Sequence, residues 1–215
     1  MSDIIGQVKS AVLAYDVKMA GNLGRKAIEE KIDLLSVANA AIEAIKEVGD
    51  SYNRGEAWLP DLIGASNAMT GLMSVIEDEL KKAGKQRQPV GTVVIGTVYG
   101  DIHSIGKDMV AALAVAEGFR VIDLGVDVKV EAFMEAIRKN KPDILAMSAL
   151  LTTTAPEQGR VIKLLKDEGL KEKIKVIVGG GPVTADFAKS IGADGFEPTA
   201  PMGVKLFKKI IGKGE

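Results

Sequence analysis

The sequence predicts a chain of two parts, a helical N-terminal part followed by an α/β domain built on a parallel sheet. Residues 1–85 contain one proline and eight glycines, whereas the remaining 130 contain six prolines and sixteen glycines. Apolar residues recur every three or four positions in the first part, and short β-branched runs alternate with helical stretches in the second. We therefore expect one domain over 1–85, a second over 86–215 and a polar, basic linker at about 81–90.

The first part is expected to form a four-helix bundle. Apolar stripes over 35–45 and 62–80 each mark one face of a long amphipathic helix. Pro60 fits the first turn of the second of these helices, where a missing N–H costs nothing. Weaker helical patterns over 3–14 and 17–30 complete the bundle.

The second part is expected to be a flavodoxin-like (Rossmann-like) five-stranded parallel sheet. Its strands read as continuous apolar runs, which is typical of sheets covered by helices on both faces. The expected strands are 92–98, 120–124, 144–147, 175–178 and a weak fifth over 193–196. The expected helices are 106–117, 130–139, 156–168, 183–191 and 201–211. Ligands of such sheets bind beyond the carboxyl ends of the strands, so the loops there should carry the function.

Composition excludes several classes of protein. The net charge is −1 and aromatic residues make up 4%, so we expect no nucleic-acid partner bound through phosphate contacts or base stacking. The chain has no cysteine and one histidine, which excludes disulfides, thiolate nucleophiles and typical zinc sites. No stretch reaches the roughly 18 apolar residues of a membrane span, and the N-terminus lacks a secretory pattern. We expect a soluble, cytoplasmic protein with no membrane partner.

The loop after the first expected strand holds the single histidine. It runs from Tyr99 to Asp108 and contains two glycines, but their spacing does not fit a phosphate-binding P-loop. An ordinary turn with permissive glycines is one interpretation. The other rests on Asp101 and His103, because a carboxylate beside an imidazole suits a metal-ligating histidine. With only one histidine in the chain, such a metal would have to arrive already chelated.

Three motifs at the ends of expected strands together resemble a known signature. Asp101-x-His103-x-x-Gly106 is followed after 41 residues by Ser148-x-Leu150 and after a further 28 by Gly179-Gly180. This pattern resembles the cobalamin-binding signature of the methionine-synthase-type corrinoid proteins.

The first part of the chain extends the resemblance. Residues 48–55 and 58–60 resemble the helical cap that precedes the cobalamin domain in the methyl-transferring branch of this family. In size and layout the chain is similar to the free-standing corrinoid proteins of methylamine, methanol, methoxy-aromatic or betaine methyltransferase systems.

The resemblance implies roles for individual residues. His103 would replace the nucleotide base of the cofactor as lower axial ligand of the cobalt, the base-off/His-on mode. Asp101 would accept the His103 N–H, and the Thr154 hydroxyl would extend that relay. Ile102 and Leu150 lie within the motifs. The displaced nucleotide tail would enter a slot formed by Gly106, Ser148, Thr152, Gly179, Gly180 and Gly181.

Some of these assignments compete with plainer interpretations. The hydroxyls could simply satisfy backbone groups at strand ends. Strand alternation would place Thr152 and Thr154 on one side and Thr153 opposite, so we assign Thr153 no role. The resemblance implies that Tyr52 and Leu59 cover the methyl-bearing face of the corrin, although the residues alone favour bundle core for Tyr52, Leu59 and Trp58. It leaves a role for Trp58 undecided.

The function implied is that of a methyl carrier rather than an autonomous enzyme. The cobalamin would cycle between cob(I)alamin and methylcobalamin, taking a methyl group from a substrate-specific corrinoid methyltransferase. It would pass that group to a corrinoid:tetrahydrofolate or corrinoid:thiol-coenzyme methyltransferase, with a reductive activator as a further partner. The linker would act as a hinge that moves the cap. The cobalamin-binding subunit of a mutase and a cobalamin-dependent regulator are the alternatives.

Overall fold

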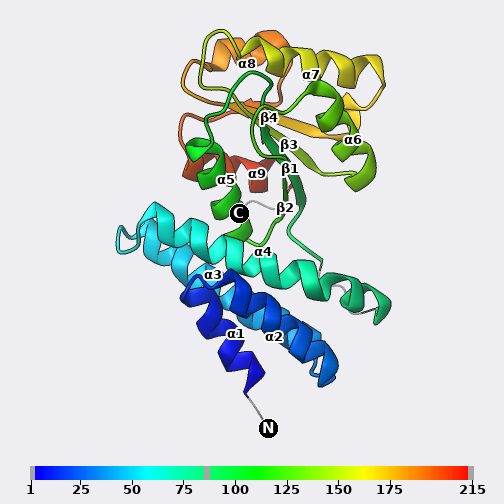
Figure 1. Cartoon of the computed structure of the whole chain (residues 1–215). Helices are drawn as coiled ribbons and strands as arrows, with labels where there is room; N and C mark the ends of the chain where they lie inside the picture. Colours follow the sequence, from blue (N-terminus) through cyan, green and yellow to red (C-terminus); the bar gives the residue numbers. More distant parts are fainter. Residues whose placement is uncertain (1–2, 85–87, 213–215) are drawn as a thin grey trace. The chain divides into compact units, whose positions relative to one another are not determined.

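The structure is a computed structural model that describes residues 3–84 and 88–212. Within these residues the chain forms nine α-helices, one short 3-10 helix and five strands (Figure 1). By internal contacts it divides into two compact units. One holds the helices of residues 4–82 with the segment 115–118, and the other holds the rest of residues 89–212. The expected boundary near residue 86 and part of the expected linker lie at 85–87, outside the described residues, so both stay predictions.

The N-terminal unit contains the four predicted helices. They are α1 (Ile4–Leu13), α2 (Val17–Glu29), α3 (Leu34–Asn53) and α4 (Leu59–Lys82). Asp3, Asp16 and Asp33 cap the first three, because each carboxylate accepts a backbone N–H from the first turn of its helix. Helix α2 packs on α4, α1 packs on α3, and α3 packs on α4, which buries the apolar stripe of each helix.

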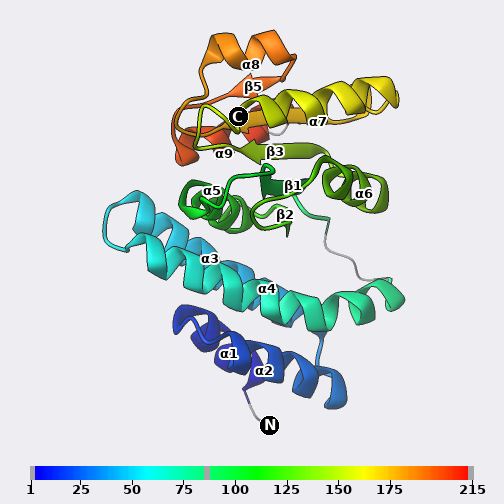
Figure 2. The ribbon, with the colours of Figure 1, turned by 45° about the horizontal axis from the view of Figure 1, so that its top comes forward.

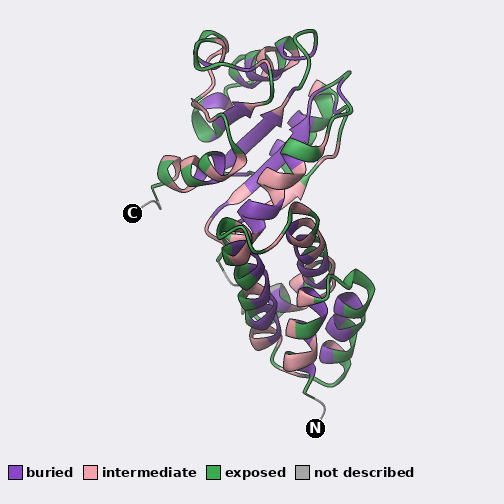
Figure 3. Ribbon diagram, turned by 90° about the vertical axis from the view of Figure 1, so that its left-hand side faces the viewer, coloured by how far each residue is buried: buried purple, intermediate pink, exposed green. Residues whose placement is uncertain are grey.

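The C-terminal unit contains the predicted five-stranded parallel sheet. The strands are β1 (Thr92–Thr97), β2 (Arg120–Asp123), β3 (Ile144–Ser148), β4 (Lys175–Gly179) and β5 (Gly195–Phe196). Their order is β2-β1-β3-β4-β5 and every pairing is parallel, which is the flavodoxin-like arrangement. The three central strands are almost wholly buried (Figure 3). The predicted fold class is confirmed.

Helices cover both faces of this sheet. They are α5 (Ile105–Ala116), α6 (Val130–Asn140), α7 (Pro156–Asp167), α8 (Ala185–Ile191) and α9 (Ala200–Ile210), with the 3-10 helix η1 (Lys171–Lys173). Helices α6, α7 and α8 pack on one face, while α5 and α9 lie on the other (Figures 1 and 2). On the α5 and α9 side the strand ends carry the small residues Ala146, Ser148 and Gly179. Small side chains there leave open space between the sheet and these two helices.

One predicted local structure is wrong. The alternation argument for Thr152, Thr153 and Thr154 assumed a strand, but β3 ends at Ser148 and these residues form turns that lead into α7. Thr154 is buried, whereas Thr152 and Thr153 are both exposed. Thr152 and Thr154 therefore do not share an environment.

The described helices include none that is both long and apolar enough to cross a membrane.

Candidate functional site

Asp101 is the centre of a hydrogen-bond cluster at the carboxyl edge of the sheet. It is fully buried in the loop after β1. Its Oδ1 accepts the His103 backbone N–H at 3.1 Å, and its Oδ2 accepts the Leu150 N–H and the Thr154 hydroxyl, both at 2.7 Å. Parallel pairing of Thr97 with Ser148 brings these two loops together. The carboxylate thus ties the loop after β1 to the loop after β3.

Burial alone would raise the pKa of the Asp101 carboxyl. Hydrogen bonds from Thr154, Leu150 and both the side chain and the backbone of His103 outweigh that effect and hold the pKa well below its usual range. Asp101 is therefore a carboxylate at neutral pH and can only accept hydrogen bonds.

This acceptor sets the tautomer of His103. The His103 Nδ1 lies 2.7 Å from Asp101 Oδ1, so in the neutral ring Nδ1 carries the proton and Nε2 keeps its lone pair. The His103 carbonyl accepts the Thr97 hydroxyl at 2.9 Å, which holds the backbone of this residue in place. The imidazole itself is about half exposed, at 48%. The result is an oriented nitrogen donor at an accessible position.

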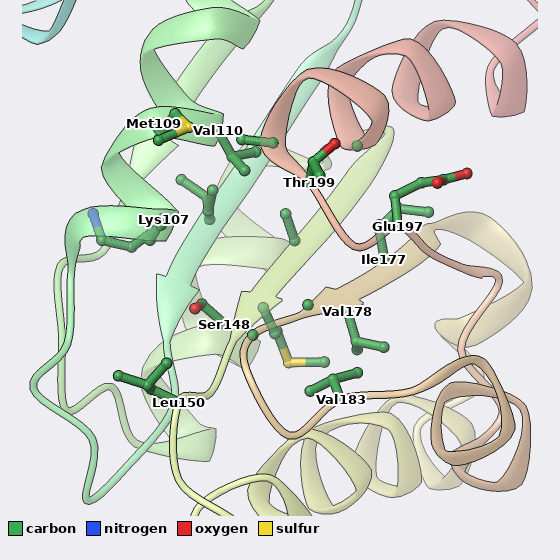
Figure 4. A pocket seen from close by; sticks show the side chains of 18 of the residues that line it. Lys107, Met109, Val110, Ser148, Leu150, Ile177, Val178, Val183, Glu197 and Thr199 are labelled. Carbon is green, nitrogen blue, oxygen red and sulfur yellow. The ribbon is translucent and has the colours of Figure 1, made fainter. Parts of the chain in front are cut away.

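A cavity of about 920 Å³ opens beside His103. It runs between the sheet and helices α5 and α9, and its walls are mostly apolar. Figure 4 shows Met109 and Val110 of α5, Ser148 at the end of β3 and Thr199 ahead of α9 around it. A cavity of this size at the carboxyl edge of a doubly wound sheet is where a ligand is expected.

Most of the sequence-predicted residues gather at this cavity. Those that line it are Ile102, His103, Gly106, Ser148, Leu150, Gly179, Gly180 and Gly181. Asp101 and Thr154 lie behind the imidazole as the predicted relay. Thr152 is not among the lining residues.

The predicted cap residues belong to the other unit. Tyr52 lies near the end of α3 and Leu59 begins α4, and each is partly buried. Trp58 is 79% exposed, so it is not bundle core. The role of these residues toward the corrin stays a prediction.

The glycines that line the cavity differ in whether a side chain would fit at their positions. Gly180 has φ of +123°, and a Cβ on it would lie 1.8 Å from the Ala149 carbonyl oxygen, so no other residue fits. A Cβ on Gly179 or Gly106 would meet no atom within 4 Å. Those two glycines are not required by packing, and their lack of a side chain enlarges the cavity that they line.

Sequence reasoning missed several buried polar residues of this domain, among them Lys107 and Gln158. Lys107 in α5 has a side chain only 2% exposed, and its Nζ contacts Asp108 at 2.6 Å and also Asp123 at the end of β2. Gln158 in α7 is fully buried. Each is a polar residue on the apolar stripe of a helix, which is a signal that a helical-wheel reading could have found.

Comparison with known proteins decides the family. Models of B12-binding domains match residues 91–202 and residues 4–77. The chain belongs to the B12-binding family. Its cofactor is cobalamin, as the three motifs indicated.

Similar proteins match along almost the entire chain. A corrinoid protein of Desulfitobacterium hafniense is 39% identical over 212 residues, covering 98% of both chains. Trimethylamine corrinoid protein 1 of Methanosarcina acetivorans is 40% identical over 210 residues, covering 97% of both.

Two solved structures are also similar to this chain over almost its entire length. The methanol:cobalamin methyltransferase complex of Methanosarcina barkeri contains a chain with a TM-score of 0.80 at 30% identity, covering 98% of this chain and 80% of that one. The monomethylamine corrinoid protein of the same organism has a TM-score of 0.53 at 30% identity, covering 97% and 98%.

The residues of the C-terminal unit fit a B12-binding protein. His103 offers one oriented nitrogen, which is all that a metal already held by four corrin nitrogens requires from the protein. Exposed Ile102 and Leu150 give an apolar surface beside it, and the cavity has room for a bulky substituent. The donor set and the space thus agree with the family assignment.

Proposed function

We propose that this protein is a methyl carrier of a methylamine-type or methanol-type methyltransferase system, holding cobalamin base-off with His103 as the lower ligand. When bound, the cobalamin would supply the methyl-transfer chemistry. The protein supplies binding, orientation and electrostatics. The named relatives support this assignment because they are corrinoid proteins of such systems.

One observation carries the proposal most directly. The His103 Nδ1 donates to a buried carboxylate, so Nε2 keeps the lone pair that can bind a metal, in a ring that lines the cavity. Asp101 orients this ring and prevents it from taking the opposite tautomer. The Thr154 hydroxyl and the Leu150 N–H keep Asp101 charged in turn. The relay thus keeps the lone pair of the neutral ring on Nε2.

The cavity would receive the displaced nucleotide tail. Gly106 and Gly179 leave space for its close approach, and Ser148 places a hydroxyl at the end of β3. Thr152 is not part of this proposal, since it is exposed and lies away from the lining.

A carrier must meet two enzymes in turn. One would be the substrate-specific methyltransferase that loads the methyl group, and the other a tetrahydrofolate-dependent or thiol-coenzyme methyltransferase that removes it. A reductive activator would restore the cofactor after accidental oxidation. The match of the N-terminal unit to a second B12-binding model supports the proposal that Tyr52 and Leu59 cover the reactive face between these encounters.

Reconstitution tests the lower ligand. The full-length protein is loaded with cobalamin, and its visible spectrum is compared with those of His103→Ala and of Thr153→Ala, an exposed neighbour that we assign no role. We expect a base-off, nitrogen-ligated spectrum in the wild type and in Thr153→Ala, and its loss in His103→Ala. An identical spectrum in His103→Ala would show that this imidazole does not bind the cobalt.

A further inference from the structure

Gln158 joins the ends of two strands without touching the cavity. It lies in the first turns of α7, and its side chain is fully buried. Its Nε2 donates to the Met147 carbonyl at 3.0 Å and to the Gly179 carbonyl at 3.1 Å. Met147 belongs to β3 and Gly179 to β4, so one amide group spans the two neighbouring strands.

The orientation of this amide follows from its partners. Both are carbonyl oxygens, which only accept, so the NH₂ group must face them and both of its hydrogens are used. The Oε1 of Gln158 then has no hydrogen-bond partner, and it is the one buried side-chain atom in this condition in the described part of the chain. Such a residue combines two satisfied donors with one desolvated acceptor.

Stability does not explain this choice of residue. The net gain from an average hydrogen bond is small, and a buried carbonyl without a donor loses a comparable amount. An apolar side chain of similar length would continue the buried stripe that Val161 and Leu165 form on the same helix. The amide is best accounted for by what it holds in place.

What it holds is part of the cavity wall. Ser148 and Gly179 form the last pair of the β3–β4 ladder, and both line the cavity. The Gly179 carbonyl also accepts the Ala149 N–H at 3.1 Å, and Gly180 then packs closely against Ala149. The Ala149 N–H bond is the last one that joins the two segments, and the Gln158 amide adds a second restraint on their separation by bonding to the end of each strand.

We propose that Gln158 is a positioning residue for cobalamin binding, which sets the spacing of the β3 and β4 ends and thereby the shape of the cavity wall that they form. It acts through the backbone at residues 147–149 and 179–180. The proposal rests on the proposed function in one respect, that the cavity receives part of the corrinoid.

The test uses Gln158→Met in the full-length protein. Methionine keeps the length of the side chain and removes both donors and the unpartnered carbonyl. Asn140→Leu is the matched control, because it deletes a side-chain amide that donates to the Ala136 carbonyl at the end of α6, within the same domain. Amide hydrogen exchange in cobalamin-free protein and the equilibrium dissociation constant for cobalamin are measured for both.

In Gln158→Met we expect faster exchange confined to residues 149–151 and 179–181, by about tenfold, and a cobalamin dissociation constant weaker by a similar factor. The thermal midpoint should stay within about 3 °C of the wild type. Asn140→Leu should change neither quantity.

Several outcomes would overturn the inference. Unchanged exchange at the strand ends, uniformly faster exchange across the sheet, or failure of Gln158→Met to fold would each show that the amide has no local positioning role. Faster exchange with unchanged cobalamin affinity would separate the strand spacing from binding. Failure of the proposed function is a different result, since the wild type itself would then lack the nitrogen-ligated spectrum.

Discussion

Replacing Asp101 by asparagine should switch the tautomer of His103. The carboxylate accepts two hydrogen bonds on Oδ1 and three on Oδ2, the third from the Leu151 N–H at 3.4 Å, whereas the asparagine amide has one accepting oxygen and one donating NH₂ group. If the oxygen of the asparagine faces His103, its NH₂ group faces the Leu150 N–H. The Leu150 N–H then loses a charge-assisted hydrogen bond and remains a buried donor without an acceptor. That arrangement costs about 3–5 kcal/mol in total.

The opposite orientation costs less. With the oxygen toward Leu150 and Thr154, only the His103 backbone N–H is left opposing a donor, at a cost of about 1–3 kcal/mol. The imidazole can adapt by accepting the new NH₂ group at Nδ1, which moves its own proton to Nε2. A protonated Nε2 cannot bind a metal, so cobalamin affinity should fall by about 10- to 100-fold.

The single histidine of the chain makes the tautomer directly measurable. Because His103 is the only histidine, the ¹⁵N spectrum of the neutral ring at alkaline pH reports its tautomer without any assignment. Thermal unfolding of cobalamin-free protein gives the stability, where a loss of about 2 kcal/mol corresponds to roughly 4–8 °C for a chain of this length.

A matched control separates loss of charge from loss of acceptors. Asp143 is an exposed carboxylate whose Oδ2 accepts the Thr92 N–H at 2.7 Å, a bond that an asparagine can keep. Asp143→Asn should therefore leave both the tautomer and the cobalamin affinity unchanged. If Asp101→Asn kept its proton on Nδ1, or lost no more stability than Asp143→Asn, the reasoning about acceptors would be refuted.

Two further predictions concern pH and the glycines after β4. Since burial is outweighed by hydrogen bonds that lower the pKa of Asp101, the stability it contributes should be complete above the unfolded-state pKa of about 3.9 and should decline as the pH falls below it. Unfolding measured between about pH 6 and pH 3 should show the difference between wild type and Asp101→Asn shrinking, and a constant difference would contradict this. Gly180→Ala should destabilise the protein by about 3 kcal/mol or more, because its methyl group would overlap the Ala149 backbone at a positive φ. Gly179→Ala should unfold like the wild type but bind cobalamin more weakly, and equal unfolding midpoints for the two variants would argue against this distinction.

The secondary structure and its order could be predicted from the sequence because their causes are local. Apolar spacing and capping aspartates define the helices of the N-terminal unit. Continuous apolar runs between helices define the strands of a parallel sheet. The motifs around His103, Ser148 and Gly179 were also recognisable, since each lies at the end of a strand or in the loop after it.

Other features depend on contacts that local sequence does not encode. Whether Thr152 or Thr154 reaches Asp101 depends on the turns after β3, where strand alternation no longer applies. The roles of Lys107 and Gln158 were likewise hidden, because their partners lie on other strands.

The sequence by itself determined the elements, their alternation and the residues able to hold a chelated metal. Only the tertiary structure decided which of those residues meet. Asp101 and Thr154 are 53 positions apart, and they form a hydrogen bond because β1 and β3 pair in parallel with Thr97 opposite Ser148. Strand pairing places the two following loops at one edge, and that register converts separate motifs into a single oriented imidazole beside a cavity.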